Sequence, residues 1–165
     1  MIDLKLINGS ESSLADMITK NKVSGKTVIV ATFGIGVKQI KKLLWEFEEV
    51  TIIIDSTHSH WQKKLWKRVL KLNSMHDNLI IKMAAIHSKV AIIDNKIVIV
   101  TSANLSQNQF IESYVIGDML EFSGIKEIIN FFNSIPVNSI DWNRTELNGK
   151  KDELNNFDEF DVFDL

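Results

Sequence analysis

Four polar side chains with the chemistry of a phosphate site lie close together in the sequence, around a run of apolar residues. They are His87, Lys89, Ser102 and Asn104, and the apolar run extends from Ile86 to Val100. An imidazole can act as a nucleophile or an acid near neutral pH, whereas an ammonium group, a hydroxyl and a carboxamide can donate hydrogen bonds to phosphate oxygens. This combination of groups indicates phosphoryl transfer.

The spacing of these residues predicts how they are brought together. We expect the apolar run to form two buried strands, joined by a turn that begins at Asp94. His87 and Lys89 are two residues apart, and strand residues with this spacing lie on the same face. Ser102 and Asn104 repeat the spacing at the end of the second strand, so the hairpin would place both pairs in one site. Asp94 is expected to support this geometry rather than to contact phosphorus.

The same residues carry a resemblance to a known family. The pattern H-x-K-x4-D from His87, followed by T-S-x-N from Thr101, resembles the HKD signature of the phospholipase D superfamily, with Thr101 where that family usually has glycine. A later glutamate in that family helps to orient the histidine, and Glu112 stands in a similar context, although the segment between Asn104 and Glu112 is shorter than in many members. By its pattern of strands and helices, the resemblance extends roughly over residues 26–118.

The resemblance implies a mechanism in which a histidine attacks phosphorus and forms a covalent phosphohistidine, which water then hydrolyses. A second histidine protonates the leaving oxygen, and neither a metal ion nor another cofactor is needed. In this chain His87 would be the nucleophile, and the other three polar residues would bind the phosphate oxygens. Because the chain has one such motif, the mechanism predicts a two-fold homodimer with His87 of each subunit at a shared site. His58, His60 and His76 lack the lysine that follows two residues later in the motif.

The elements that would position these residues are indicated by apolar patterns along the chain. Nearly continuous runs of valine and isoleucine are typical of strands that are covered on both faces, and apolar residues three and four apart indicate helices. We expect strands at 26–33, 50–55, 79–84 and 114–116 beside the hairpin, and helices from a cap at 10–13 to about 20 and at 40–47, 61–72 and 125–132. The predicted fold class is α/β, an α/β/α sandwich with a mixed β-sheet. This agrees with the phospholipase D-like fold that the resemblance implies.

Length and composition limit the classes of protein that remain. The chain has 165 residues, 45% of them hydrophobic, with one proline, which favours one compact domain over residues 1–150 and a separate tail at 151–165. The absence of cysteine excludes disulfides and cysteine-based metal sites. Residues 1–5 lack the layout of a secretory signal, and no apolar run approaches the ~20 residues that cross a bilayer. We therefore expect a cytoplasmic protein without a membrane partner.

Charge is distributed unevenly between the predicted domain and the tail. Residues 151–165 contain one basic and six acidic side chains, which leaves 18 bases against 15 acids, a net charge of +3, in residues 1–150. The predicted helix after Thr57 carries part of this positive charge. Its basic residues are Lys63, Lys64, Lys67, Arg68 and Lys71, flanked by Trp61 and Trp66. Cations beside an aromatic ring suit a nucleic-acid backbone and an unstacked base, although an ordinary helix with a solvated basic side has the same pattern.

The tail has a pattern of its own. Phe157, Phe160 and Phe163 recur at intervals of three among acidic residues and would share one side of a helix. Because three large aromatic side chains are poor choices for solvation alone, we expect the tail to dock a protein partner. Shielding of the basic domain and a flexible, solvated end are the alternatives.

These features predict a metal-independent phosphodiesterase that works as a homodimer through a phosphohistidine. A compact chain with a single motif is more similar to the nuclease members of the family than to the lipid-cleaving members, which are usually larger and carry two motifs. The leading hypothesis is a DNA endonuclease, with single-stranded DNA as a candidate substrate. The alternative is a non-catalytic phosphate- or nucleic-acid-binding module that recruits partners through its acidic tail, and a lipid phosphodiesterase is third.

Overall fold

Strands and helices alternate through most of the chain. The structure is a computed structural model that describes residues 3–8, 13–56, 63–106 and 111–137. The strands are β1 (Asp3–Asn8), β2 (Thr27–Thr32), β3 (Glu49–Asp55), β4 (Leu79–Ala84), β5 (Val90–Ile93), β6 (Ile97–Thr101) and β7 (Ile111–Asp118). The helices are α1 (Leu14–Lys20), α2 (Val37–Glu46), α3 (Lys63–Met75) and α4 (Ile125–Ser134), with a short 3-10 helix, η2 (Met119–Glu121). In these parts of the chain no helix is long and apolar enough to span a membrane.

One seven-stranded sheet holds the strands in the order β1-β7-β6-β5-β2-β3-β4. β2, β3 and β4 are parallel neighbours, and α2 and α3 connect them. The other neighbouring pairs are antiparallel, including the β5–β6 hairpin. The mixed sheet predicted from the sequence is therefore confirmed.

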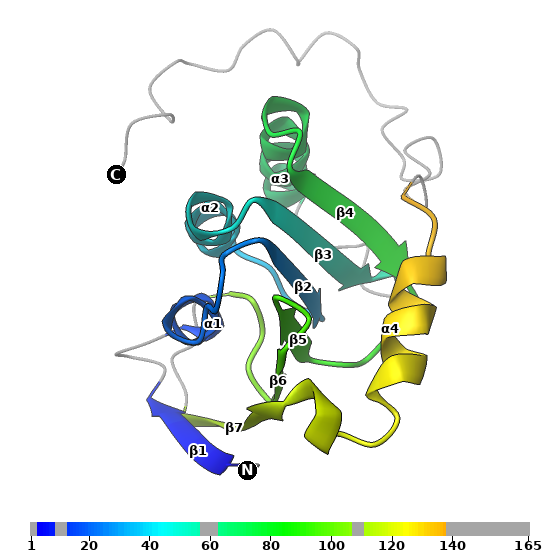
Figure 1. The fold of residues 1–165 in the computed structure, drawn as a ribbon. Helices are drawn as coiled ribbons and strands as arrows, with labels where there is room; N and C mark the ends of the chain where they lie inside the picture. The colour runs from blue at the N-terminus through cyan, green and yellow to red at the C-terminus, as the bar shows by residue number, and fades with distance from the viewer. Residues whose placement is uncertain (1–2, 9–12, 57–62, 107–110, 138–165) are drawn as a thin grey trace, which may run out of the picture.

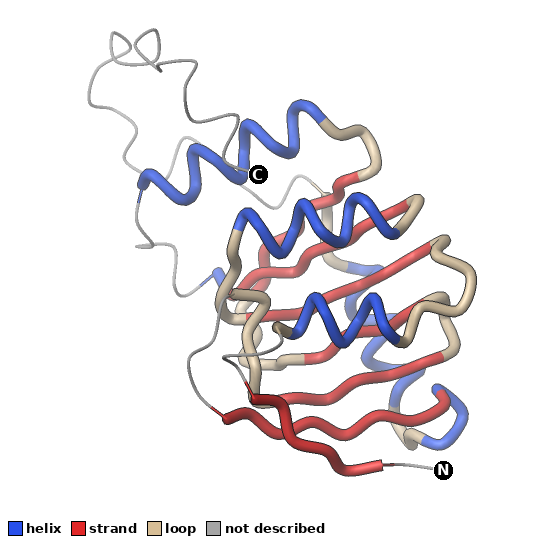
Figure 2. Tube along the Cα trace, turned by 90° about the vertical axis from the view of Figure 1, so that its left-hand side faces the viewer, coloured by secondary structure: helices blue, strands red, loops and turns tan. Residues whose placement is uncertain are grey.

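Helices cover both faces of the sheet, so the domain has three layers. α1, α2 and α3 lie side by side on one face, and α4 lies on the other (Figure 1, Figure 2). Successive residues of β5 illustrate the division, because Ala91 and Ile93 pack with the three-helix side. Val90 and Ile92 pack with the α4 side. Burial on both faces explains the continuous apolar runs, and the predicted α/β/α sandwich is confirmed.

An ion pair fastens α1 to α2 on the outer side of the first layer. Ser13 caps α1, and the Asp16 carboxylate accepts hydrogen bonds from its backbone N–H at 2.7 Å and its hydroxyl at 2.6 Å. The same carboxylate pairs with Lys42 of α2. Partial burial by itself raises the pKa of Asp16, but the hydrogen bonds from Lys42 and Ser13 outweigh it and lower the pKa to about 2.

A buried lysine holds α4 against the edge of the sheet. The Lys82 Nζ, on the edge strand β4, donates a hydrogen bond of 3.0 Å to the carbonyl oxygen of Phe132. The last carbonyls of a helix have no partners within the helix, so a cation there stabilises the helix end. Phe132 also buries its ring in the core on this face, so both contacts fix the same turn of α4.

Two parts of the fold differ from the sequence prediction. The sequence predicts no strand before residue 26, but β1 pairs along its length with β7. The hairpin is shorter than predicted, because β5 begins at Val90 rather than at Ile86. His87 and Lys89 therefore precede the strand instead of lying in it. The predicted tail, 151–165, lies outside the described residues.

Candidate active site

The polar residues of the motif gather at one edge of the sheet, which we call the site edge. β2, β3, β4 and β6 end there, whereas β5 and β7 begin there. The segments 33–36, 85–89 and 102–106 adjoin these strand ends. The fold thus brings three loops together that are far apart in the sequence.

Residues 85–89 cross the site edge from β4 to β5, past the ends of β3 and β2. β4 and β5 are three strand spacings apart, about 14 Å, and the six Cα steps from Ala84 to Val90 can span up to about 20 Å. The segment spans this gap without being fully extended: the chain turns at residue 85, and the Ile86 N–H donates a hydrogen bond of 2.9 Å to the Ala84 carbonyl oxygen. Because His87 and Lys89 are two residues apart on it, they can still share one side.

Both side chains contact the ring of Phe33, the residue that follows β2. The ring centroids of Phe33 and His87 are 5.1 Å apart in an edge-to-face arrangement. The Nζ of Lys89 lies 6.0 Å from the centroid of the same ring, at the outer limit of a cation–π contact. His87 is exposed and Lys89 is half-buried, so both can reach a ligand from solvent. Phe33 was not among the residues that the sequence predicted.

Asn104 is held in place by the loop that follows β2. Its Oδ1 accepts a hydrogen bond of 3.2 Å from the backbone N–H of Gly34. The next residue, Leu105, donates its N–H to the Thr32 hydroxyl at 3.0 Å. The Leu105 carbonyl oxygen in turn accepts a bond of 2.7 Å from the N–H of Gly36. Since Oδ1 is used as an acceptor, the NH2 group of Asn104 is the donor that can serve a phosphate oxygen.

Two hydroxyl groups fasten the end of β6 to β7. The Ser102 hydroxyl accepts a hydrogen bond of 3.0 Å from the Ser113 N–H, and the Thr101 hydroxyl donates one of 2.9 Å to the Ser113 carbonyl. Thr101 Oγ1 also accepts a bond of 2.9 Å from the N–H of Ala103. These contacts give Ser102 a role in positioning the loop that carries Asn104. A glycine at 101, usual in the family that the motif resembles, would lack the hydroxyl that makes two of these bonds.

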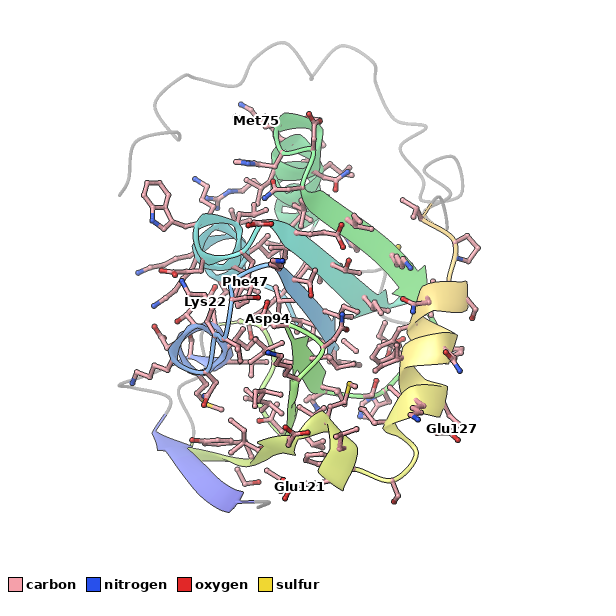
Figure 3. The ribbon with its side chains drawn as sticks, viewed as in Figure 1. Lys22, Phe47, Met75, Asp94, Glu121 and Glu127 are labelled. Carbon is pink, nitrogen blue, oxygen red and sulfur yellow. The ribbon has the colours of Figure 1, made fainter. Side chains whose placement is uncertain are left out.

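Asp94 lies at the other end of the hairpin, where Asp94 and Asn95 both have a φ of 52°. β5 separates it from Lys89, about 16 Å of extended chain. The carboxylate, labelled in Figure 3, accepts five backbone N–H bonds of 2.7–3.1 Å from residues 23–27, which form the loop after α1 and the first residue of β2. Partial burial by itself raises the pKa of Asp94, but these bonds outweigh it and hold the pKa well below its usual range. Asp94 therefore anchors a loop at the edge opposite to the site.

The basic helix is exposed along part of its predicted side. Arg68 and Lys71 of α3 are exposed and Lys67 is half-buried, whereas Val69 is buried. Trp66 is half-buried and packs against the core of the three-helix side. It therefore offers less ring surface for stacking than the sequence suggested.

The remaining predicted residues are placed only in part. Glu112 lies in β7, where its backbone pairs with Ile7, and Lys63 and Lys64 begin α3. His58, His60 and Trp61 lie outside the described residues. Across the described ranges, no three His, Asp or Glu side chains gather as a metal site would require.

The three-layer fold and the His, Lys and Asn side chains at its site edge define a domain of the phospholipase D type. The family described as "Cardiolipin synthase, PLD-like domain" matches residues 15–121, which include the whole HKD motif and Glu112. The chain belongs to this family, so the family predicted from the motif is confirmed. No curated protein sequence matches the chain.

Solved structures with the same fold include two bacterial proteins of similar size. NucT from Helicobacter pylori has 20% sequence identity and a TM-score of 0.59, over 81% of this chain and 94% of that one. Nuc from Salmonella typhimurium, described as a phospholipase D family member, has 16% identity and a TM-score of 0.60, over 82% and 97%. TrmBL2, described as an archaeal chromatin protein with a novel mode of DNA binding, has 14% identity and a TM-score of 0.53, over 80% and 52%. At these identities the likeness establishes the fold.

Proposed function

We propose that the chain is a metal-independent phosphodiesterase that cleaves DNA as a homodimer through a phosphohistidine. The observation that carries this proposal is the convergence of His87 and Lys89 on the Phe33 ring, next to the loop in which Asn104 is fastened. Membership of the PLD-like family supports the same chemistry.

In the proposed reaction, a ring nitrogen of His87 attacks phosphorus, and the bond from phosphorus to the leaving oxygen breaks. The Lys89 ammonium group and the Asn104 NH2 group donate hydrogen bonds to the non-bridging oxygens. They stabilise the negative charge that a metal ion stabilises in many other phosphodiesterases. Water then attacks phosphorus and gives a proton to the group that had protonated the leaving oxygen, the P–N bond breaks, and His87 is regenerated.

The leaving oxygen needs a proton, and a second histidine must supply it. Among the described residues the other histidine is His76, which lies between α3 and β4 at the edge opposite to the site. We therefore assign this role to His87 of the partner subunit, in a two-fold dimer that joins two site edges. The exposure of His87 supports this arrangement, because its imidazole is accessible to a second copy of the chain.

Nucleic acid is the substrate that the surface charge favours. Because β3 ends at the site edge and β4 begins at the opposite edge, α3 runs away from the site. Its exposed Arg68 and Lys71 suit a phosphate backbone that extends beyond the reacting group. The fold also occurs in TrmBL2, a chromatin protein that is described as binding DNA.

Cleavage in the presence of a chelator tests the proposal. We expect purified protein to cleave single- or double-stranded DNA equally well with and without excess EDTA. His87→Ala should lower the rate by about 10³-fold or more, because the nucleophile is lost. His76→Ala, at the opposite edge, is the matched control and should retain activity. Loss of cleavage in EDTA, or full activity of His87→Ala, would contradict the proposal.

Mixing experiments test the shared site. When His87→Ala protein is added in excess to wild-type protein and the subunits are allowed to exchange, the activity per wild-type subunit should fall towards zero. Each mixed dimer then has a single histidine at the site. An excess of His76→Ala protein should cause no such fall. Unchanged activity with the His87→Ala variant, together with a monomeric mass in sedimentation, would rule out the shared site.

A non-catalytic nucleic-acid-binding module is the second candidate, and the likeness to TrmBL2 favours it. It predicts that the protein binds DNA without turnover and that no phosphohistidine accumulates on a labelled substrate. In that case His87→Ala should weaken DNA binding modestly and change no rate.

A further inference from the structure

Two neighbouring helices carry parallel stripes of exposed residues that start near the site edge. α2 and α3 pack side by side on the same face of the sheet (Figure 2). Both follow strands that end at the site edge, and both lead to strands that begin at the opposite edge. Their outer sides therefore run together away from the site, over about 15 Å for the ten residues of α2.

The exposed side of α2 has helical spacing and ends in a tryptophan. Lys38, Lys41 and Trp45 are exposed at positions i, i+3 and i+7, which lie on one side of a helix. Trp45 is 90% exposed, whereas Ile40 and Leu43 on the other side of the helix are fully buried. So large an indole surface in solvent is unusual, because Trp side chains are normally buried over most of their area.

The stripe on α3 has the same composition. Arg68, Lys71 and Met75 are exposed at positions i, i+3 and i+7, and Met75, at the end of the helix, is 62% exposed (Figure 3). Each stripe thus consists of cations followed by a large apolar side chain at its far end.

The charge on this surface has one sign. α2 and α3 contain eight lysines and arginines and one carboxylate, Glu46. Glu46 is paired with Lys22 at 2.6 Å, and Lys42 is paired with Asp16 of α1. The exposed cations of the two stripes make no ion pair with any residue that the structure describes. They are Lys38, Lys41, Arg68 and Lys71.

We propose that these two stripes form a track for single-stranded nucleic acid, in which the cations follow the backbone and Trp45 stacks on an unpaired base. Proteins bind single strands by combining cations along the backbone with aromatic rings that stack on bases, and stacking requires a base that is not already paired. The track rests on the proposed function, because it would lead the strand to the site edge. It adds to that function a binding surface on α2 and a preference for single strands.

An anionic membrane surface is the other partner that basic residues and an exposed tryptophan can bind. The arrangement favours nucleic acid, because the stripes extend from an edge at which a phosphodiester is proposed to react. A track that begins there can hold the continuation of the same polymer, whereas a membrane headgroup has no continuation along the helices.

Binding and catalysis can be measured separately with the full chain. Fluorescence anisotropy with labelled dT20 measures binding of a single strand to the track. Hydrolysis of bis(p-nitrophenyl) phosphate, an ester too small to contact the track, measures the activity of the reacting groups alone. Trp45→Ala should weaken dT20 binding by about 10-fold, and Trp45→Phe should restore most of it. The double variant Lys38→Gln/Lys41→Gln should weaken binding and reduce the slope of log affinity against log salt by about 1.4, the value for two contacts to a single strand. All of these variants should hydrolyse the small ester at the wild-type rate.

Lys96→Gln/Lys126→Gln is the matched control, because both lysines are exposed and lie away from α2 and α3. It should bind dT20 as the wild type does. The track is overturned if the α2 variants bind dT20 as tightly as the control, or if they instead lose affinity only for phosphatidylglycerol vesicles. If the wild type binds dT20 through Trp45 but does not hydrolyse the ester, the track stands and the proposed catalytic function fails.

Discussion

The polar residues of the motif lie at two ends of the hairpin. Those that we propose to react with or bind phosphate are at one end, and a residue that supports the fold is at the other. His87 and Lys89 are at the site edge, where they contact one ring, and Asn104 is fastened there by Gly34. Asp94 is at the opposite end and is occupied by five backbone N–H groups. A residue within the spacing of a motif is therefore not necessarily within reach of its ligand.

Replacing the Asp94 carboxylate should destabilise the fold. In Asp94→Asn the five N–H groups lose an ionised acceptor, so we expect the free energy of unfolding to fall by about 2–3 kcal/mol. Asparagine tolerates the φ of 52° at this position, so the variant tests the charge rather than the turn. Urea unfolding at pH 7 measures the loss. Asp77→Asn, at an exposed turn position, is the control, and equal stability of the two variants would contradict the anchoring role.

At the scale of the elements, the ion pair between α1 and α2 should make the free energy of unfolding depend on pH in the acid range. The pKa of Asp16 is about 2 in the folded chain and 3.8 in the absence of structure. A carboxyl with a lowered pKa stabilises the fold at pH values above its unfolded pKa, and this contribution is lost as the pH falls through the folded pKa. We expect Asp16→Asn to cost about 1–2 kcal/mol at pH 7, with the difference from wild type shrinking between about pH 4 and pH 2. Urea unfolding of both proteins at several pH values tests this, and a constant difference over that range would contradict it.

The helices and strands could be predicted wherever their buried sides produce a regular spacing of apolar residues in the sequence. The strands from β2 to β6 are mostly apolar and rich in valine and isoleucine, and α2 places Ile40 and Leu43 on one buried side. β1 could not be predicted in this way, because its pairing with β7 joins residues more than a hundred positions apart. The path of segment 85–89 depends likewise on the strand order, which sets the span between β4 and β5.

The clustering of the polar residues could be predicted from their spacing, but the residues that hold them in place could not. Phe33 and Gly34 follow β2 and have no spacing relation to His87 or Asn104 in the sequence. Their contacts arise because β2 and β5 are antiparallel neighbours, so the end of one meets the start of the other. The exposed position of Trp45 was implied by the spacing of α2, since it lies off the side marked by Ile40 and Leu43.

At the scale of the whole molecule, the predicted domain, residues 1–150, and the predicted tail, residues 151–165, have opposite net charge. Residues 1–150 carry a net charge of +3, whereas the full chain carries −2. At low salt, attraction to a polyanion depends on this sum, because the screening length rises from about 8 Å at physiological salt to about 30 Å at 0.01 M. The tail should therefore weaken non-specific binding of nucleic acid, either through its charge alone or by docking on the basic domain.

Deletion of residues 152–165 tests this opposition. The truncated chain loses six acids and has a net charge of +4, so we expect its affinity for non-specific DNA to rise by about 10-fold at low salt, and the gain to shrink as salt is added. A full-length variant with serine in place of Phe157, Phe160 and Phe163 keeps every charge and separates two causes. If the charge of the tail alone opposes DNA, this variant binds as the wild type does. If the aromatic rings must dock the tail on the domain, it binds like the truncated chain. Equal DNA affinity of the truncated and full-length chains across the salt range would show that the tail does not shield the domain.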